Sequence, residues 1–289
     1  MSSSTSRRKF LKAGAAVAAA GALAVVGDGV IFEANRPKLV SIEIPLSRLA
    51  ESWDGFRIVQ LSDLHYDDRF SVIPLRKAVD LVNELQPDLV VVTGDFITSP
   101  LVKHRPQIIR AASVIEPCAR LLAQMQAHFG IFASLGNHDV STDPAHVTAG
   151  LEAHGISVLR NRSVPLERDG ARLWMAGLDD VLAGKPDLKL TLKAVPPAEP
   201  VVLLAHEPDF ADYVAHADLQ LSGHSHGGQI RIPLIGAPYL PAMGRKYPRG
   251  LRQIGPLTLY TNVGIGTIVV PMRLDCPPEV TLITLRQAR

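Results

Sequence analysis

The sequence predicts an α/β fold, and a repeated pattern along the chain is the main reason. Short runs of consecutive apolar residues are each followed by a polar turn that carries His, Asp or Asn. Five such stretches occur, at residues 56–65, 88–95, 130–139, 200–208 and 217–226. Apolar residues at consecutive positions are typical of strands buried on both faces, so we expect five strands inside one or more sheets.

The stretch 74–86, between the first two of these runs, is the clearest helix candidate. Its apolar residues recur mainly three or four positions apart, and Pro87 follows it directly. That spacing gives a helix one apolar face, and a proline just beyond it ends the helix. The order strand, helix, strand is the unit of an α/β fold.

The first 30 residues are interpreted as a signal or an N-terminal anchor, and residues 31–289 as a single domain. The basic run RRKFLK at residues 7–12 precedes small apolar residues from Ala13 to Gly27. This order is typical of secretory signals, and the paired arginines resemble a twin-arginine signal. Because residues 22–24 (Ala-Leu-Ala) offer only a weak cleavage site, a cleaved signal and an uncleaved anchor both stay open. We expect the twin-arginine export machinery as a partner, and a location in the periplasm or on the outer face of the cytoplasmic membrane.

Composition makes a general nucleic-acid binder improbable. The formal net charge is only +2, and aromatic residues that could stack on bases make up 5% of the chain. The two cysteines, Cys118 and Cys276, lack the spacing of a metal or redox motif, and the sequence does not decide whether they pair.

One long segment, from Leu219 to Leu274, contains no Asp or Glu. Its basic residues are Arg231, Arg245, Lys246, Arg249, Arg252 and Arg273. A solvated basic loop explains this pattern as well as a surface for a substrate phosphate or a lipid headgroup does. Contact with a membrane surface is therefore an expectation that the sequence leaves open.

Polar residues at the ends of the five runs are the candidate ligands of a metal site. Ligands of open α/β sheets bind beyond the carboxyl ends of the strands, which is where these turns are expected. The candidates are Asp63, His65, Asp95, Asn137, His206, His224 and His226. Each alone is more often an ordinary turn residue, but their repeated placement favours a composite site. Asp179 and Asp180 also follow a strand-like run, but a carboxylate pair in a turn is more often solvated, so both are left out.

This set of donors suits borderline divalent ions such as Mn, Fe, Zn or Co better than Ca or Mg. Two divalent ions held by two aspartates and a bridging hydroxide keep a net positive charge, which attracts a phosphate anion. Two neighbouring ions lower the pKa of a bridging water and hold the phosphoryl oxygens during in-line attack. The residues themselves thus predict phosphoryl chemistry.

The ordered blocks D-x-H, G-D, G-N-H-D, H and G-H-x-H resemble those of the calcineurin-like metallophosphoesterases. Two further segments, HGGQIRIP from His226 and GIGTIVVPMRLDCPPEV from Gly264, resemble a bacterial branch with twin-arginine signals or membrane anchors. That branch commonly carries an Arg shortly before Gly-x-Gly-Thr. This chain departs from that pattern, since Asn262 and Val263 stand there.

The resemblance implies a four-layer αββα sandwich, with two mixed β-sheets flanked by helices and a dinuclear metal site at the strand ends. One ion would be held by Asp63, His65, Asp95 and His226. The other would be held by Asp95, Asn137, His206 and His224, so that Asp95 bridges the two. The catalytic residues would be His138, facing the substrate without binding metal, and Asp139, holding His138 or its turn in place.

The implied role of His138 is to hydrogen-bond a phosphoryl oxygen or to protonate the leaving alkoxide. A proton donor matters most for poor leaving groups. We therefore expect its loss to damage alkyl-ester hydrolysis more than nitrophenyl-ester hydrolysis.

The expected activity is hydrolysis of phosphodiester or pyrophosphate bonds by a metal-bridging hydroxide. The export signal and the basic segment favour lipid or cell-envelope substrates, and relatives of this kind act on UDP-diacylglucosamine-like pyrophosphates. Phosphomonoesters and cyclic nucleotides are the alternative substrates. The alternative to an enzyme is a metal-binding scaffold that does not catalyse a reaction. Such a scaffold would be expected to lack some of the ligands or His138.

Overall fold

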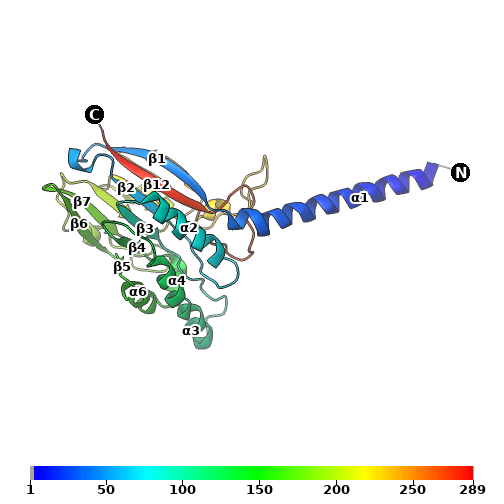
Figure 1. Cartoon of the computed structure of the whole chain (residues 1–289), viewed down its shortest axis with the longest axis horizontal. Helices are drawn as coiled ribbons and strands as arrows, with labels where there is room; N and C mark the ends of the chain where they lie inside the picture. Colours follow the sequence, from blue (N-terminus) through cyan, green and yellow to red (C-terminus); the bar gives the residue numbers. More distant parts are fainter. Residues whose placement is uncertain (1–2, 289) are drawn as a thin grey trace.

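The computed structural model describes residues 3–288 as two six-stranded β-sheets packed face to face, with a long N-terminal helix projecting from one end (Figure 1). Sheet A contains, in spatial order, β1 (Lys38–Leu46), β12 (Glu279–Gln287), β2 (Arg57–Leu61), β3 (Leu89–Thr93), β4 (Ile131–Ser134) and β5 (Ile156–Val158). Sheet B contains β10 (Gly250–Ile254), β11 (Leu257–Thr261), β9 (Leu219–Ser222), β8 (Val201–Leu204), β7 (Ala171–Gly177) and β6 (Arg162–Arg168).

Both sheets are mixed, as the sequence led us to expect. Strands β2, β3, β4 and β5 run parallel, whereas β12 is antiparallel to β2 and parallel to β1. In sheet B the central strands are parallel, and the edge strands β10 and β6 are antiparallel to their neighbours. Every residue of β3 and β8 is buried, because each sheet is covered on both faces.

Helices cover the outer face of sheet A. They are α2 (Val72–Leu85), α4 (Ile115–Leu122) and α6 (Pro144–Glu152). The helix expected at 74–86 is confirmed as α2, which buries Leu75, Val79 and Val82 against the sheet and ends where Gln86 turns left-handed before Pro87. Near the strand ends lie α3 (Arg105–Ser113) and α5 (Asn137–Thr142).

The outer face of sheet B has a thinner cover. It consists of the short helix α7 (Leu188–Thr191), the 3₁₀ segment η4 (Pro208–Tyr213) and the loops beside them, which pack on the outward side chains of β7, β8, β9 and β11. A separate core between the sheets joins side chains such as Val91 and Val202. The four-layer sandwich is thus confirmed.

The N-terminal helix α1 (Ser3–Gly27) stands apart from these layers. The segment from Lys9 to Asn35 is long and apolar enough to cross a membrane, with a mean hydropathy of 2.0, and only 7% of that window is buried. A signal sequence meets the same criteria, so this finding fits a cleaved signal and an anchor equally well. The side chains of residues 7, 8 and 22–24 lie outside the described part of the structure.

The segment behind α1 packs against the sandwich. Gly29 is buried, and its carbonyl accepts a hydrogen bond from the backbone N–H of Arg273 at 3.1 Å. The carboxylate of Glu33 accepts another from the N–H of Cys276 at 2.7 Å. The packed part of the chain therefore begins near Gly29, and the base of α1 is fixed to the loop before β12.

The two cysteines do not pair. Cys118 and Cys276 are both buried with free thiols. Cys118 lies in the core beneath α4, whereas the thiol of Cys276 donates to the carbonyl of His226 at 3.2 Å. This answers the question that the sequence left open.

Candidate metal centre

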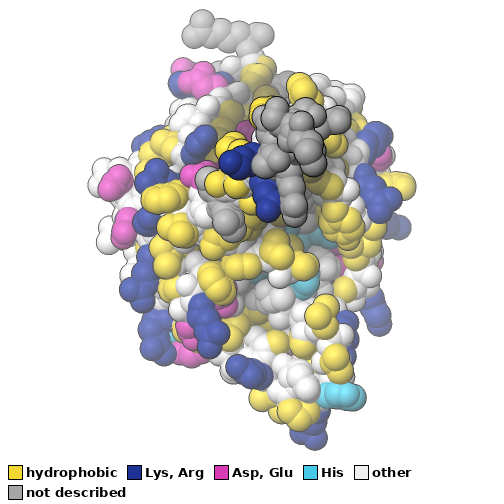
Figure 2. Space-filling view, turned by 90° about the vertical axis from the view of Figure 1, so that its right-hand side faces the viewer, with side chains coloured by type: hydrophobic (Ala, Val, Ile, Leu, Met, Phe, Trp, Pro, Cys, Tyr) yellow, Lys and Arg dark blue, Asp and Glu magenta, His cyan; other side chains and the backbone are white. Residues whose placement is uncertain are grey.

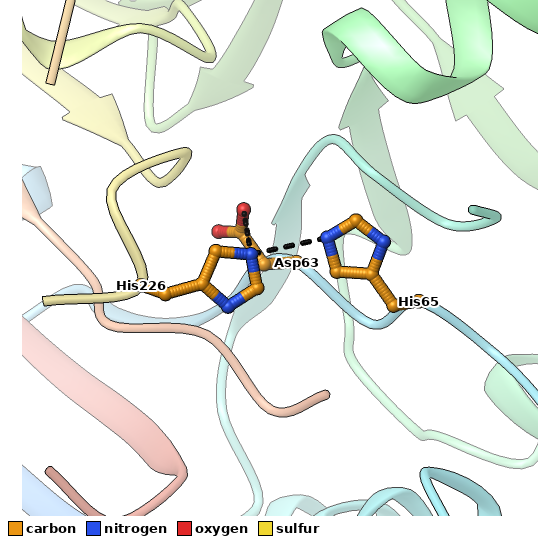
Figure 3. A group of neighbouring side chains, drawn as sticks. All are labelled: Asp63, His65 and His226. Atoms are coloured by element: carbon orange, nitrogen blue, oxygen red, sulfur yellow. Dashed lines mark hydrogen bonds and ion pairs between the residues drawn. The ribbon is translucent and has the colours of Figure 1, made fainter. Parts of the chain in front are cut away.

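The seven expected ligands all lie together at one end of the sandwich, where strands β2, β3, β4, β8 and β9 end. Figure 3 shows three of them pointing toward one another: Asp63 and His65 from the loop after β2, and His226 from the loop after β9. Their ligand atoms lie within 4.8 Å of one another, and Nε2 of His226 is 3.1 Å from Nε2 of His65 and 3.4 Å from Oδ1 of Asp63. This group has the donors and the spacing to hold a metal ion.

Asp95 lies between this group and a second one. Its Oδ2 is 3.6 Å from Nε2 of His65 and 3.2 Å from Nε2 of His206. Asp63, Asp95 and His206 also form a group of potential metal ligands with one another. A carboxylate with imidazoles of both groups around it has the position that a bridging ligand needs.

Backbone strain is concentrated at these residues. Five of the seven have a positive φ, between 41° and 68°: Asp63, His65, Asp95, His224 and His226. Residues other than glycine seldom adopt this left-handed conformation, which costs on the order of 1–3 kcal/mol each and persists mainly at functional sites. The fold therefore imposes this geometry against local preference.

Glycines allow the strand ends to approach this closely. A Cβ at Gly94 would lie 2.6 Å from Nδ1 of His206, and one at Gly264 would lie 2.7 Å from Cβ of Asp63. The segment around Gly264 also donates backbone hydrogen bonds from Ile265 and Gly266 to the carbonyls of Ser62 and Asp63, at 2.9 and 2.8 Å. The Gly-x-Gly-Thr motif thus supports the D-x-H turn from behind.

Hydrogen bonds outside the ligand set fix which ring nitrogen is free in His206 and His224. Nδ1–H of His206 donates to the carbonyl of Thr93 at 2.6 Å, and Nε2–H of His224 donates to the carbonyl of Ala242 at 2.7 Å. Nδ1 of His65 lies 3.1 Å from the hydroxyl of Thr98. Such contacts orient metal-binding imidazoles. No sequence pattern marks these partners, since two of them act through backbone carbonyls.

The free donor atoms fit a cation. Nε2 of His206 is buried and has no hydrogen-bond partner among the described residues. Nδ1 of His224, which keeps a lone pair when Nε2–H donates, lies 3.0 Å from the amide oxygen of Asn137. A buried orphan nitrogen and two acceptors in contact are unfavourable unless a positive ion lies between them.

The electrostatics favour the metal-binding protonation state at His65, His224 and Asp95. They oppose it at two other expected ligands, because burial raises the pKa of Asp63 to about 6 and Asp95 outweighs burial to raise the pKa of His206. Burial lowers the pKa of His65 to about 3 and that of His224 to about 4, so both rings are neutral. Burial opposes the charged form of Asp95, but His206 and other histidines outweigh it and hold the pKa of that carboxyl well below its usual value. Neutral imidazoles and an ionised carboxylate are the forms that bind metals.

His138 lies beside the ligands but differs from them in its hydrogen bonding. Its Nδ1 accepts a hydrogen bond from the backbone N–H of Ser99 at 2.9 Å, so Nε2 carries the proton of the neutral ring. A ring bound in this way presents an N–H donor and has no lone pair left for a metal. The ring is thus set to donate a hydrogen bond from Nε2.

Asp139 contacts backbone amides. Its Oδ1 accepts from the N–H groups of Phe96 and Ile97 at 3.0 and 3.2 Å, and its Oδ2 accepts from that of Gly136 at 3.0 Å. Burial raises the pKa of this carboxyl to about 8. The carboxylate thus joins the loop after β3, which carries Asp95, to the turn after β4, which carries Asn137 and His138.

Replacing Asp139 by Ala is expected to destabilise the fold, because three buried N–H groups lose their acceptor. Each unsatisfied group costs about 1–3 kcal/mol, so we expect a loss of at least about 3 kcal/mol in the free energy of unfolding. Urea denaturation of the two proteins measures the difference. A loss below about 1 kcal/mol would show that water replaces the carboxylate.

The expectation that Asp179 and Asp180 are solvated was wrong. Both are buried, and Oδ1 of Asp179 accepts a hydrogen bond from Nε of Arg160 at 2.6 Å. Oδ1 of Asp180 accepts from the backbone N–H groups of Leu182 and Ala183, which closes the turn after β7. The pair stabilises this turn and lies outside the groups of potential metal ligands.

A cavity of about 680 Å³ opens over the site. Its floor includes Asp95, Asn137, His138, His224 and His226. Its walls are mostly apolar and include Leu182, Ile230, Pro238, Tyr239, Pro241, Ala242, Ile268, Val269 and Val270. A small polar floor under apolar walls is typical of ligand-binding cavities.

Comparison with known proteins agrees with this geometry. Residues 56–228 match the calcineurin-like phosphoesterase family, and residues 4–24 match the twin-arginine translocation signal sequence. The chain is 37% identical to the uncharacterized metallophosphoesterase YkuE of Bacillus subtilis, over 97% of this chain and 98% of that protein. It is 31% identical to the phosphodiesterase YaeI of Escherichia coli, over 97% and 99%.

A vertebrate relative is similar as well. The chain is 34% identical to a transmembrane protein with metallophosphoesterase domain of Danio rerio, over 90% of this chain and 60% of that protein. The family match covers the ligand-bearing turns from Asp63 to His226. The chain therefore belongs to the calcineurin-like phosphoesterase family of metal-dependent phosphoric-ester hydrolases, and its twin-arginine signal directs it across the cytoplasmic membrane.

Proposed function

We propose that this enzyme hydrolyses phosphodiester or pyrophosphate bonds in amphiphilic molecules of the membrane or cell envelope. The observation that carries the proposal is the cavity, in which a floor of ligands and His138 lies under apolar walls. A phosphoryl group on the floor leaves the rest of the substrate against those walls, where burial of each CH₂ contributes about 0.8 kcal/mol. The names of two relatives, a phosphodiesterase and a transmembrane protein, support it.

Two ions would be held around Asp95, with the assignment that the family resemblance implies. One ion would be held by Asp63, His65, Asp95 and His226. The other would be held by Asp95, Asn137, His206 and His224. Mn, Zn or Fe suits these nitrogen and oxygen donors. When bound, such ions supply a hydroxide nucleophile and neutralise charge on the phosphoryl oxygens.

The remaining groups of the site act on the substrate and on its surroundings. His138 donates its Nε2–H to a phosphoryl oxygen, and the N–H of Ser99 keeps that ring in the donor form. The apolar walls exclude water from the phosphoryl group, which strengthens this hydrogen bond. Asp139 keeps the loops of β3 and β4 in register.

A chain-length series tests the proposed substrate class. Alkyl nitrophenyl phosphodiesters should show kcat/KM rising by at least about 10-fold from methyl to octyl, because the longer chain contacts the apolar walls. Tyr239→Ser should flatten this rise, since Tyr239 lines the cavity.

Tyr213→Ser is the matched control, because Tyr213 is exposed to 69% and Tyr239 to 72%, yet Tyr213 does not line the cavity. Equal rates at every chain length, or faster hydrolysis of phosphomonoesters or cyclic nucleotides, would contradict the proposal.

The export signal gives a further expectation. The combined change of Arg7→Lys and Arg8→Lys should leave the protein in the cytoplasm but active, because the twin-arginine pathway carries proteins that have already folded. Cell fractionation with an activity assay measures both properties. Normal export of the double variant would show that another signal directs the chain.

A further inference from the structure

We infer that two loops around the mouth of the cavity form a surface that inserts into the lipid bilayer on which the enzyme works. The loops are residues 229–240 and 267–274, named here the rim loops. Insertion of this surface does not depend on the proposed function. Only its use as a route for substrate rests on the proposed function.

The tips of the rim loops expose large apolar side chains completely. Leu234 is 109% and Val269 is 95% exposed, and Ile235 and Tyr239 beside them exceed 70%. Leu234 and Val269 also have positive φ values, 68° and 66°. For a β-branched or bulky residue this conformation is an outlier, and Gly or Asn would adopt it more easily. In water both residues cost free energy, because their apolar side chains are exposed and their backbone conformation is strained. In a bilayer these side chains would be buried.

The rim loops form one unit. The side-chain amide of Gln229 donates to the carbonyls of Ile268 and Val270 at 3.1 and 3.0 Å, and its oxygen accepts from the N–H of Ile268 at 2.8 Å. The backbones of Arg231 and Leu274 are joined by another hydrogen bond at 2.8 Å. Their apolar tips are therefore held together as a defined patch.

The patch lies at the same end of the molecule as the base of α1. The N–H of Arg273, in the second rim loop, donates to the carbonyl of Gly29, directly behind α1. In Figure 1, α1 leaves the sandwich between loops whose colours match the rim loops. Figure 2 looks onto this end: hydrophobic side chains gather around the base of α1, and histidine side chains are visible in a hollow below it. A membrane that holds α1 faces the patch and the cavity mouth together.

The charges near the patch suit an anionic bilayer. Of the basic residues between Leu219 and Leu274, Arg273 is buried and Lys246 pairs with Asp212 at 2.7 Å, so neither is free to bind lipid. Arg245 and Arg249 are exposed at the end of sheet B that carries the metal centre, and Figure 2 shows Lys and Arg side chains along the edges of this face. Basic residues near a bilayer surface are attracted to anionic headgroups.

The consequence concerns how the substrate reaches the site. Tyr239, Val269 and Val270 belong both to the patch and to the walls of the cavity. Insertion of the tips places the mouth at headgroup depth. An amphiphile can then move from the bilayer to the metal centre without crossing water.

Fluorescence quenching tests the insertion without any need for activity. The full chain carries a bimane label at Leu234→Cys or Val269→Cys, and the native cysteines are buried. It is reconstituted in phosphatidylethanolamine–phosphatidylglycerol vesicles that contain acyl-chain spin labels. Both labels should be quenched at least about twofold. A label at Arg168→Cys, on the exposed β6–β7 hairpin at the opposite edge of sheet B, should be unaffected.

Labels at 234 and 269 that are quenched no more than the one at 168 would overturn the inference.

A double substitution to glycine, named here the glycine pair, gives a second test with a variant that is expected to fold. Leu234→Gly with Ile235→Gly removes two exposed apolar side chains of the first rim loop that do not line the cavity, and glycine relieves the left-handed strain at position 234. This variant should keep wild-type activity on a soluble nitrophenyl ester and lose at least about 10-fold on a vesicle-embedded lipid phosphodiester. The matched control Leu190→Gly removes an exposed leucine of α7, outside the patch.

Equal activity of the glycine pair and the wild type on vesicles would contradict the inferred substrate route. Failure of both proteins on every lipid would instead contradict the proposed function, while the quenching result still decides the insertion.

Discussion

Replacement of Asp95 by Ala should remove both metal ions and abolish hydrolysis, which is the largest effect that the structure predicts. The carboxylate lies within 3.6 Å of an imidazole from each ligand group, so its loss takes a ligand from both ions at once. No other expected ligand is shared. Elemental analysis after incubation with Mn or Zn measures the metal content directly.

Two variants separate this effect from misfolding. In the wild type, Oδ1 of Asp95 accepts a hydrogen bond from the backbone N–H of His138 at 2.9 Å. Asp95→Asn keeps an oxygen that can accept this bond but lacks the negative charge. It should fold and bind the ions weakly. His226→Ala should lose mainly one ion, because His226 belongs to a single group. An Asp95→Ala protein that folds and retains one ion would show that Asp95 does not bridge.

Replacement of His138 by Ala should lower kcat by about 10²–10³-fold while both ions stay bound. This is the loss typical of removing one preorganised donor to a developing charge. The prediction differs in one respect from the expectation from sequence. Since Nδ1 accepts from Ser99, the ring donates a hydrogen bond and does not release a proton, so alkyl and nitrophenyl esters should lose similar factors.

Kinetics on the two esters, with metal analysis of the same preparation, decide the role of His138. A loss confined to the alkyl ester would show proton donation to the leaving group. A loss of metal would show that His138 is a ligand, and that its contact with Ser99 breaks in the loaded enzyme.

The clustering of the candidate metal ligands was predictable because each follows closely after a strand. Once the apolar runs are recognised as strands, the carboxyl ends bring Asp63, Asp95 and Asn137 to one edge by topology alone. The helix 74–86 was predictable for a similar reason, since its apolar spacing and Pro87 are local signals. Local patterns therefore indicated both the candidate site and the helix between β2 and β3.

Other features depend on contacts between distant segments, and no local pattern reveals them. The partner of Asp139 is a set of backbone amides, which carry no sequence signature. The tautomer of His138 depends on the N–H of Ser99, 39 residues away. Asp179 looked like a solvated turn residue because its partner, Arg160, precedes it by 19 residues on another strand connection.

The walls of the cavity were not predictable either. They come from loops that follow β7, β9 and β11, and Tyr239 and Val269 are 30 positions apart in the sequence. In the sequence, the evident feature of the segment from Leu219 to Leu274 is its basic residues. The structure shows that its apolar tips are the more unusual feature, because they are exposed and strained.

The number of ions bound by the purified wild-type protein tests the central claim most directly. Elemental analysis after incubation with Mn or Zn and removal of free metal should give two ions per chain, since two groups of ligands meet at Asp95. One ion or none per chain would contradict the dinuclear centre on which the proposed chemistry depends.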